Sequence, residues 1–177
     1  DKIVIATGSL ATPLPGIEFD EKIIVSSTGA LKLEKVPKKM VVVGGGYIGL
    51  EMGSVWSRLG AEVQVVEFLD HITPGMDKEI SSEFMKILKK QGIKFNMQNK
   101  VEKIEKNTSG AVVSTVNKDG NKNNFECDVV LISVGRKPNT EGLNLKKVGV
   151  SLDEKKRIKT DKFFKTNIEN IYAIGDV

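Results

Sequence analysis

Three glycines at a fixed spacing point to chemistry with phosphate groups. Gly44, Gly46 and Gly49 fit the pattern G-x-G-x-x-G in the segment GGGYIG at residues 44–49. In that pattern the first glycine permits a tight turn, the second lets the backbone approach a pyrophosphate, and the third allows close helix packing. A helix that starts here adds unpaired N–H groups and a positive dipole end. The segment therefore predicts a dinucleotide site, provided that a strand precedes it and a helix follows.

The residues around the glycines supply that context. An apolar run at residues 40–43 predicts a buried parallel strand, and apolar residues at helical spacing then predict a helix that ends at Gly60. Residues 62–67 predict a second strand, which completes a βαβ unit. Glu67 ends this strand, where an acid binds ribose hydroxyls and repels a 2′-phosphate, so we expect NAD rather than NADP. The alternative is that the glycines form only a tight turn and Glu67 is a solvated strand end.

The remaining patterns predict an α/β, Rossmann-like domain with a central parallel sheet and a small antiparallel insert. Residues 77–92 predict an amphipathic helix whose buried stripe is Ile80, Phe84, Ile87 and Leu88. Further strands are expected at residues 1–8, 93–97, 128–134, 157–160 and 171–174, a helical turn at 27–31 within a connection over 10–38, and the insert at 101–105, 111–116 and 124–127 with a turn at Asp119-Gly120.

Composition excludes several classes of function. The chain has 177 residues, a net charge of +4 and basic residues interleaved with acids, so we expect neither nucleic acid nor membrane as a partner. Cys127 is the only cysteine and lies beside an apolar run, which favours a buried small hydrophobe over a redox role. His71 is expected at the surface. With one cysteine and one histidine, no zinc site is expected.

The glycine segment and its surroundings resemble a known family. Residues 44–68, beginning GGGYIGLE, and residues 77–92, DKEISSEFMKILKKQG, resemble the NAD domain of lipoamide dehydrogenases. Ala6-Thr7-Gly8 and Ile174-Gly175-Asp176 are similar to flanking motifs of the wider FAD/NAD-linked pyridine nucleotide-disulfide oxidoreductase family. The resemblance implies an enzyme that passes electrons from dihydrolipoamide through a cysteine pair and FAD to NAD. It also implies a homodimer that serves 2-oxo acid dehydrogenase complexes in the cytoplasm, or in the mitochondrial matrix of a eukaryote.

The resemblance also implies roles for single residues in NAD binding. Glu67 would hold the adenosine ribose, Glu51 would approach the nicotinamide carboxamide, Val101 would offer its backbone to the adenine, and Gly135 would line the NAD cleft. Tyr47 either packs against the sheet edge or covers the flavin face, as a similar tyrosine does in glutathione reductase-like members. The pyrophosphate would be held by the glycine segment, namely Gly44, Gly45, Gly46, Tyr47, Ile48 and Gly49.

FAD contacts are implied at both ends of the chain. Thr7, Gly8 and Ser9 would touch FAD, Asp176 would bond its ribityl chain, and Arg136 would be a further FAD contact. The family's FAD fingerprint, cysteine pair and His-Glu pair do not occur in this chain and are expected before and after it. No residue of the chain is therefore expected to be catalytic, and the chain alone is expected to be inactive.

Both ends lie in apolar, strand-like runs, so we expect a segment of a longer protein. Residues 1–38 would be a connection from an FAD domain, residues 39–170 an NAD-binding domain, and residues 171–177 the start of a return to the FAD domain. Two alternatives stay open. One is the NAD domain of another flavoprotein reductase, of the NADH oxidase or mercuric reductase type, which a CxxxxC pair elsewhere in the gene would help to decide. The other is a non-catalytic NAD-binding module.

Overall fold

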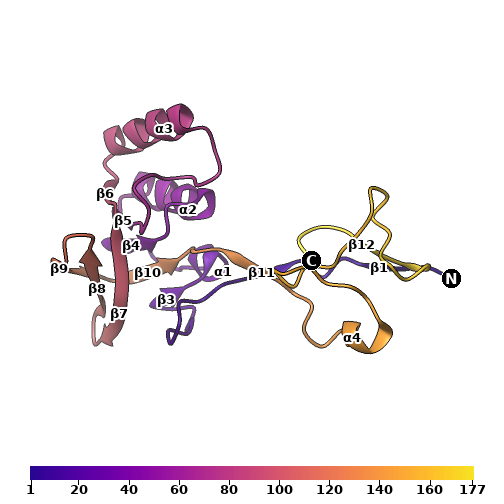
Figure 1. The fold of residues 1–177 in the computed structure, drawn as a ribbon. Helices are drawn as coiled ribbons and strands as arrows, with labels where there is room; N and C mark the ends of the chain where they lie inside the picture. The colour runs from indigo at the N-terminus through magenta and orange to yellow at the C-terminus, as the bar shows by residue number, and fades with distance from the viewer. The chain divides into compact units, whose positions relative to one another are not determined.

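The chain forms two compact units in a computed structural model that describes all 177 residues (Figure 1). The central unit is Pro13–Val134, and the terminal unit combines Asp1–Thr12 with Gly135–Val177. The sequence predicted boundaries between FAD-linked and NAD-linked segments after residues 38 and 170. These boundaries concern cofactor binding and stay a prediction.

A five-stranded parallel sheet forms the middle of the central unit. Its strand order is β3-β10-β4-β5-β6, and every neighbouring pair is parallel, as the expected central parallel sheet requires. The strands are β3 (Ile24–Val25), β4 (Lys39–Val43), β5 (Glu62–Val66), β6 (Lys94–Asn96) and β10 (Val129–Ile132), and the helices between them are α1 (Ser27–Ala30), α2 (Tyr47–Arg58) and α3 (Lys78–Lys90). β3 lies within the segment that the sequence predicted to be a connection with one helical turn.

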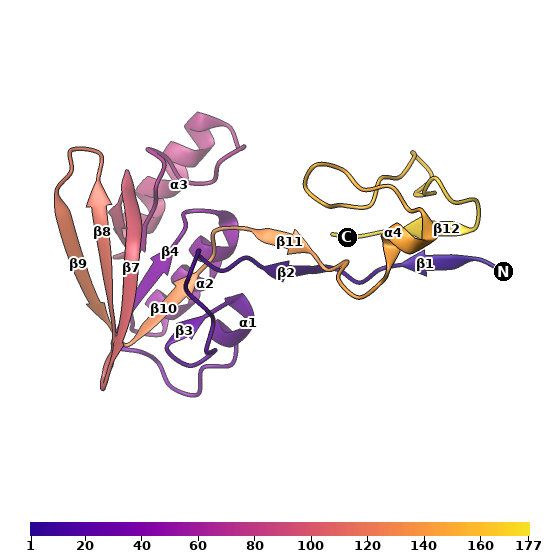
Figure 2. The same ribbon diagram turned by 60° about the horizontal axis from the view of Figure 1, so that its bottom comes forward.

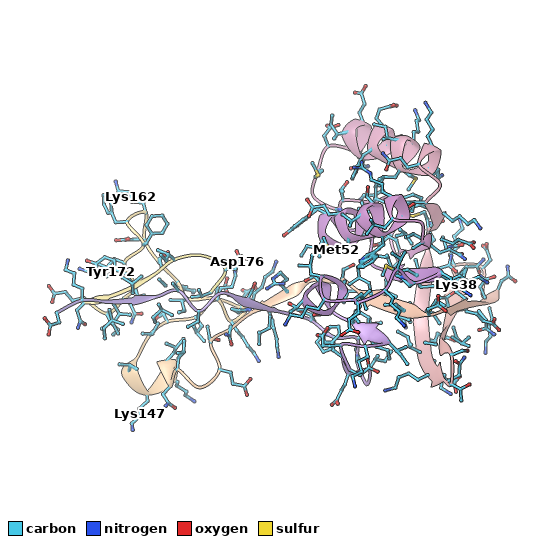
Figure 3. The ribbon with its side chains drawn as sticks, turned by 180° about the vertical axis from the view of Figure 1, so that it is seen from behind. Lys38, Met52, Lys147, Lys162, Tyr172 and Asp176 are labelled. Atoms are coloured by element: carbon cyan, nitrogen blue, oxygen red, sulfur yellow. The ribbon has the colours of Figure 1, made fainter.

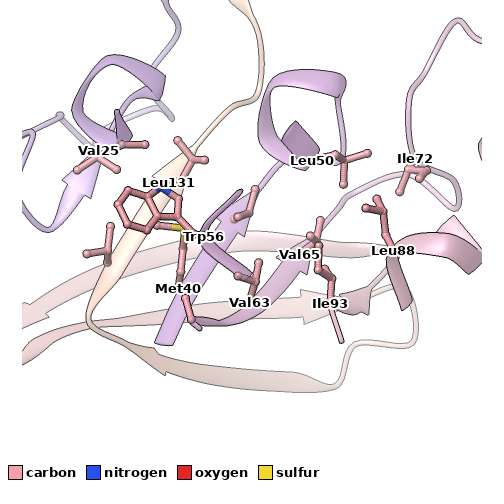
Figure 4. Close-up of a cluster of buried hydrophobic side chains, with 14 residues drawn as sticks. Val25, Met40, Leu50, Trp56, Val63, Val65, Ile72, Leu88, Ile93 and Leu131 are labelled. Carbon is pink, nitrogen blue, oxygen red and sulfur yellow. The ribbon is translucent and has the colours of Figure 1, made fainter. Parts of the chain in front are cut away.

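Both faces of this sheet are covered, which explains the unbroken apolar runs of β4 and β10. On one face, Met40 packs with Trp56 of α2 and with Leu131 (Figure 4). On the other face, Val41 and the remaining inward residues of that side pack against the antiparallel sheet. Each large side chain buried in this way stabilises the fold by about 1.5–3 kcal/mol. The two clusters together fix β4 in the centre of the unit.

The antiparallel insert is confirmed as β7 (Asn99–Asn107), β8 (Gly110–Asn117) and β9 (Lys122–Cys127) (Figure 2). Gly120, with a φ of 82°, lies in the expected turn between β8 and β9. Cys127 is 6% exposed, and burial raises the pKa of its thiol to about 11. The expectation of a buried cysteine is confirmed.

The terminal unit is built from short elements. β1 (Ile3–Ile5) pairs in parallel with β12 (Ile171–Ala173), and β2 (Ser9–Ala11) pairs antiparallel with β11 (Arg136–Pro138). α4 (Leu145–Val148) adds Leu145 to a small buried cluster. The strand expected at residues 157–160 is wrong: only an isolated bridge joins Leu152 and Ile158. β2 and β11 are short and, unlike β1 and β12, have no continuous apolar run, so the sequence did not predict them.

The stripe predicted for α3 is partly wrong. Leu88 is buried and Phe84 is partly buried, but Ile80 is 57% exposed and Ile87 is 52% exposed. α3 connects β5 to β6, which is the edge strand of the sheet. The sheet is therefore not wide enough beneath α3 to cover its whole apolar side. None of the helices is both long and apolar enough to cross a membrane.

Candidate dinucleotide-binding site

Two of the three fingerprint glycines are required by the fold itself. Gly44 follows β4 with a φ of 108°, and a Cβ there would lie 2.6 Å from the Ser133 carbonyl oxygen. A Cβ on Gly49 would collide with Ser133 Oγ and would lie 2.6 Å from the Gly44 carbonyl oxygen. These contacts give Gly44 the tight-turn role and Gly49 the packing role that the spacing predicted.

Gly46 is different, because nothing in the chain requires a glycine there. Its φ is −74°, and no atom lies within 4 Å of an added Cβ. Gly46 is the N-cap of α2 and provides no side-chain cap, and the first helical bond runs from Leu50 N to Gly46 O. The N–H groups of the first turn therefore have no helical acceptor. Open space and unpaired donors occur together at this one point, as an anion site requires.

Glu67, the residue after β5, is held tightly beside this loop. It is 9% exposed, and its Oε2 and Oε1 accept N–H groups from Gly45 at 2.5 Å and from Leu69 at 2.8 Å. Its own N–H donates to the Asn96 carbonyl, and its carbonyl accepts from Asn99 N at 2.9 Å. A carboxylate oxygen has two lone pairs, so each can still accept a hydroxyl. Glu67 is therefore not the solvated strand end of the alternative interpretation.

Three hydroxyl residues that support the glycine loop had not been singled out from the sequence. Ser133 Oγ donates to the Val43 carbonyl at 3.1 Å, from the end of β10 next to β4. Thr73 N donates to the Gly45 carbonyl at 2.8 Å, and Thr73 Oγ1 lies 2.7 Å from Ser81 Oγ. The place of Ser133 after a parallel neighbour of β4 could have suggested its role. The spacing of Thr73 and Ser81 carries no such signal.

The other expected NAD contacts of the central unit lie on α2 and β7. Tyr47 is 64% exposed, so its ring is not buried against the sheet edge in this chain, and its role in the full-length protein stays a prediction. Glu51 is also exposed and lies four residues further along α2, hence on the same side of the helix as Tyr47. Ile48 is half-buried. Val101 is half-buried beside a β-bulge in β7, a feature common near functional sites.

Three of the residues expected to contact FAD, Ser9, Arg136 and Asp176, form a hydrogen-bonded group in the terminal unit, and Asp176 is labelled in Figure 3. Arg136 Nε donates to Ser9 Oγ at 2.7 Å, and Arg136 Nη2 donates to the Ser9 carbonyl at 2.6 Å. Ser9 Oγ lies 3.5 Å from Asp176 Oδ2. Thr7 Oγ1 donates to the carbonyl of Asn139, a residue that the sequence did not single out, at 2.7 Å.

The two remaining predicted contacts of this unit are glycines. Gly8 has a φ of 70° and Gly135 has a φ of 137°, both in the region that favours glycine, and neither would bring a Cβ within 4 Å of another atom. The Gly135 carbonyl accepts an N–H from Thr12 at 3.0 Å.

Other candidate chemistry is sparse. No group of three His, Cys, Asp or Glu residues could hold a metal ion. His71 is half-exposed; its Nδ1 lies 2.6 Å from Asp70 Oδ1, and this hydrogen bond lowers the pKa of Asp70. A groove of about 710 Å³ lies at the amino ends of β4 and β10, lined by Lys38, Asp128 and other charged residues. The glycine loop follows the carboxyl end of β4, so the groove is a separate feature.

The chain is similar to known proteins over almost its whole length. The sequence pattern of the family described as pyridine nucleotide-disulphide oxidoreductase matches residues 1–177. The dihydrolipoamide dehydrogenase of Chaetomium thermophilum is 55% identical over 176 residues, which are 98% of this chain and 35% of the relative. The mitochondrial dihydrolipoyl dehydrogenase of Caenorhabditis elegans is 54% identical over 177 residues, which are 99% of this chain and 36% of the relative. The chain spans about a third of the length of these curated relatives.

A solved structure has the same fold. The crystal structure of LpdA from Mycobacterium tuberculosis superposes on 99% of this chain and 38% of its own, with a TM-score of 0.86 and 27% sequence identity.

Proposed function

This chain belongs to the pyridine nucleotide-disulphide oxidoreductase family, as its resemblance implied, and we propose that its central unit binds NAD at the amino end of α2. The observation on which the proposal rests is the open space at Gly46, which the fold leaves free next to unpaired N–H groups and a buried acid. A Cβ at Gly46 would fill this space, so the residue suits a ligand rather than the packing of the chain.

The donors and acceptors of this site match two parts of an adenosine diphosphate, namely its pyrophosphate and its ribose. The N–H groups at the start of α2 donate to the pyrophosphate oxygens, and the helix dipole favours their negative charge. The free lone pairs of Glu67 accept the 2′- and 3′-hydroxyls of the ribose. A 2′-phosphate would meet the Glu67 carboxylate, and residues 68–70 offer no cation to offset the repulsion. NAD is therefore the proposed cofactor rather than NADP.

Two exposed side chains in the first part of α2 would serve the nicotinamide half. Tyr47 and Glu51 lie one turn apart on the same side of the helix, so a ligand that starts at Gly46 can run past both. Glu51 would accept a hydrogen bond from the carboxamide. The exposed ring of Tyr47 would cover an aromatic cofactor face, with Val101 as a further contact of NAD. The NAD contact that the family resemblance implies for Gly135 stays a separate prediction.

The terminal unit would hold part of FAD. Asp176 would accept a hydrogen bond from a hydroxyl of the ribityl chain, and Ser9 and Arg136 would fix the position of its carboxylate. Thr7 and Gly8 would contribute the adjacent backbone. Bound FAD and NAD would supply the electron relay and the hydride acceptor, which side chains alone cannot provide.

For the full-length protein we propose a homodimeric dihydrolipoamide dehydrogenase that serves 2-oxo acid dehydrogenase complexes in the mitochondrial matrix or the cytoplasm. The 54–55% identity to enzymes of that name supports the substrate. The chain by itself would be inactive. Its only thiol, Cys127, is buried with a pKa raised to about 11, so it cannot supply the thiolate that attacks a disulfide. An NADH oxidase, a mercuric reductase or a non-catalytic NAD-binding module would share the central site, but no contact described above favours one of them.

The nucleotide preference tests this proposal. We expect NADH to bind more tightly than NADPH by about 1–3 kcal/mol, because a 2′-phosphate loses the hydrogen bonds to the charged Glu67. Isothermal titration calorimetry with both nucleotides measures the difference. Glu67→Gln should narrow it, whereas Glu126→Gln, which changes an exposed carboxylate on β9, should leave it unchanged. Equal affinities in the unmodified chain would refute the proposed site.

A further inference from the structure

Thr73 has a conformation that its side chain disfavours. Its φ is 49°, in the left-handed region, and it is 3% exposed. A β-branched residue is rare in this region because its side chain crowds the backbone. Residues held in such conformations cluster at ligand sites, where the surrounding contacts determine them.

The contacts of Thr73 join α3 to the glycine loop. Thr73 Oγ1 lies 2.7 Å from Ser81 Oγ, and Ser81 Oγ donates to the Asp77 carbonyl at 2.9 Å. A hydroxyl has one hydrogen to donate. Because Ser81 gives its hydrogen to Asp77, the Thr73 hydroxyl is the donor to Ser81. Both side chains are buried, so water does not replace these bonds.

The backbone of Thr73 sets the direction of one peptide group in the site. Thr73 N donates to the Gly45 carbonyl at 2.8 Å. The Gly45–Gly46 peptide is trans, since the chain has no cis peptide bond, and in a trans peptide the N–H points opposite to the carbonyl. The Gly46 N–H therefore points away from Thr73 and stays without a partner in the chain.

The other two N–H groups of the loop are already used. Gly44 N donates to the Val66 carbonyl at 2.9 Å, and Gly45 N donates to Glu67 Oε2. Gly46 thus provides the one free N–H within the glycine triplet. Its direction depends on the bond that Thr73 makes on the other side of the same peptide.

We propose that Thr73 and Ser81 are positioning residues for the nucleotide pyrophosphate. They hold the Gly45–Gly46 peptide so that Gly46 N–H faces the ligand. This inference rests on the proposed function of the site as an NAD site. It extends that site to two hydroxyls on the loop after β5 and on α3, neither of which touches the nucleotide.

The test compares variants of the full-length protein that contains this chain. Thr73→Val keeps the shape and the backbone strain but removes the hydroxyl, and Ser81→Ala removes its acceptor. Each should weaken NADH binding by about three- to tenfold, the loss of one buried hydrogen bond. Thr73→Ser keeps the hydroxyl and should bind NADH within about twofold of the unmodified protein. The double variant Thr73→Val/Ser81→Ala should be no weaker than the weaker single variant, because both changes remove the same bond.

Dissociation constants for NADH, measured beside the midpoint of thermal unfolding, separate the possible outcomes. Variants with a lower midpoint and an unchanged NADH affinity would show a purely structural role and overturn the inference. If the fold losses of NADH affinity of the two single variants multiply in the double variant, the two hydroxyls act independently and their pairing is overturned. If Thr73→Val does not fold, Ser81→Ala, which leaves Thr73 in place, decides the question in the same way. Absence of NADH binding by the unmodified protein would instead overturn the proposed function.

Discussion

The two units place their candidate contacts on different parts of the chain. In the central unit the proposed pyrophosphate and ribose contacts are backbone N–H groups of the glycine loop and one acid that is 9% exposed. In the terminal unit they are the side chains of Ser9, which is half-buried, and of Arg136 and Asp176, which are exposed. The hydrogen bonds that join them span 127 sequence positions between Ser9 and Arg136 and 167 positions between Ser9 and Asp176.

This difference explains why one site can be recognised from spacing and the other cannot. A backbone site limits which residues fit at each position: Gly44 needs a positive φ and Gly49 has no room for a Cβ. These limits leave a fixed pattern within six residues. A site of exposed side chains imposes no such steric limit, so its members are identified only through a family resemblance.

The largest effect on the free energy of unfolding is expected at Gly49, where the recognisable spacing of the central site depends on tight packing. Gly49→Ala would force its Cβ against Ser133 and Gly44, and overpacking of this kind costs about 1–3 kcal/mol. Gly53→Ala is the matched control on the same helix. Its Cβ would lie 3.4 Å from Val63, an ordinary contact, and alanine favours a helix over glycine by about 1 kcal/mol. Chemical denaturation should show a loss for the first variant and no loss for the second. A Gly49→Ala variant as stable as the unmodified chain would contradict the claim that close packing requires a glycine at this position.

The next effect is a loss of FAD affinity through a change in the terminal unit. It sharpens the comparison of the two units because NADH affinity should not change with it. Arg136→Met removes both hydrogen bonds to Ser9 while keeping a long side chain. In the full-length protein we expect FAD affinity to fall about tenfold, since bonds to charged groups contribute about 1.5–3 kcal/mol when shielded and less when exposed. NADH affinity should stay unchanged.

Lys137→Met, on the neighbouring residue of β11, is the control for the loss of a positive charge. Flavin absorbance after dialysis and NADH titration give the two readouts. A variant Arg136→Met that loses NADH and keeps FAD would reverse the assignment of the two units.

A smaller effect is expected at Asp20, which precedes β3 in the central unit. Partial burial raises the pKa of Asp20, but N–H groups of Lys22, Ile23 and Ile24 and the ammonium of Lys106 outweigh it and lower the pKa to about 2. A lowered pKa stabilises the fold above the ordinary value of 3.8, and this contribution is lost as the pH falls from about 4 to about 2. Because the side chain is 27% exposed, we expect about 1 kcal/mol.

Asp20→Asn should therefore be less stable than the unmodified chain at pH 7, and the two should converge near pH 2. Asp119→Asn, in the exposed turn before β9, serves as the control. Urea unfolding as a function of pH measures the difference, and parallel curves for the Asp20 variant and the unmodified chain would contradict the role of this carboxylate.

The sequence predicted the parts of the fold that have a continuous apolar run, a helical or alternating pattern, or a position that only glycine can occupy. The parallel strands β4, β5 and β10, the helices α2 and α3 and the antiparallel insert were all expected. The exposed Ile80 and Ile87 were not, because a helical pattern does not show how wide the sheet below it is. Thr73 and Ser133 were not expected in the site either. Thr73 donates to the Gly45 carbonyl and Ser133 to the Val43 carbonyl, bonds that form only when segments distant in the sequence meet in the fold.

The account as a whole depends on Gly46, where the fold leaves room that a ligand would use. Gly46→Ala adds a Cβ that meets no atom of the chain, so the midpoint of thermal unfolding should not change. Calorimetric titration should show NADH affinity reduced by about tenfold or more, because the methyl group would occupy the place of the pyrophosphate, whereas Gly53→Ala should bind NADH as the unmodified chain does. An unchanged NADH affinity in Gly46→Ala, at the same thermal midpoint, would contradict the assignment of this loop as the nucleotide site.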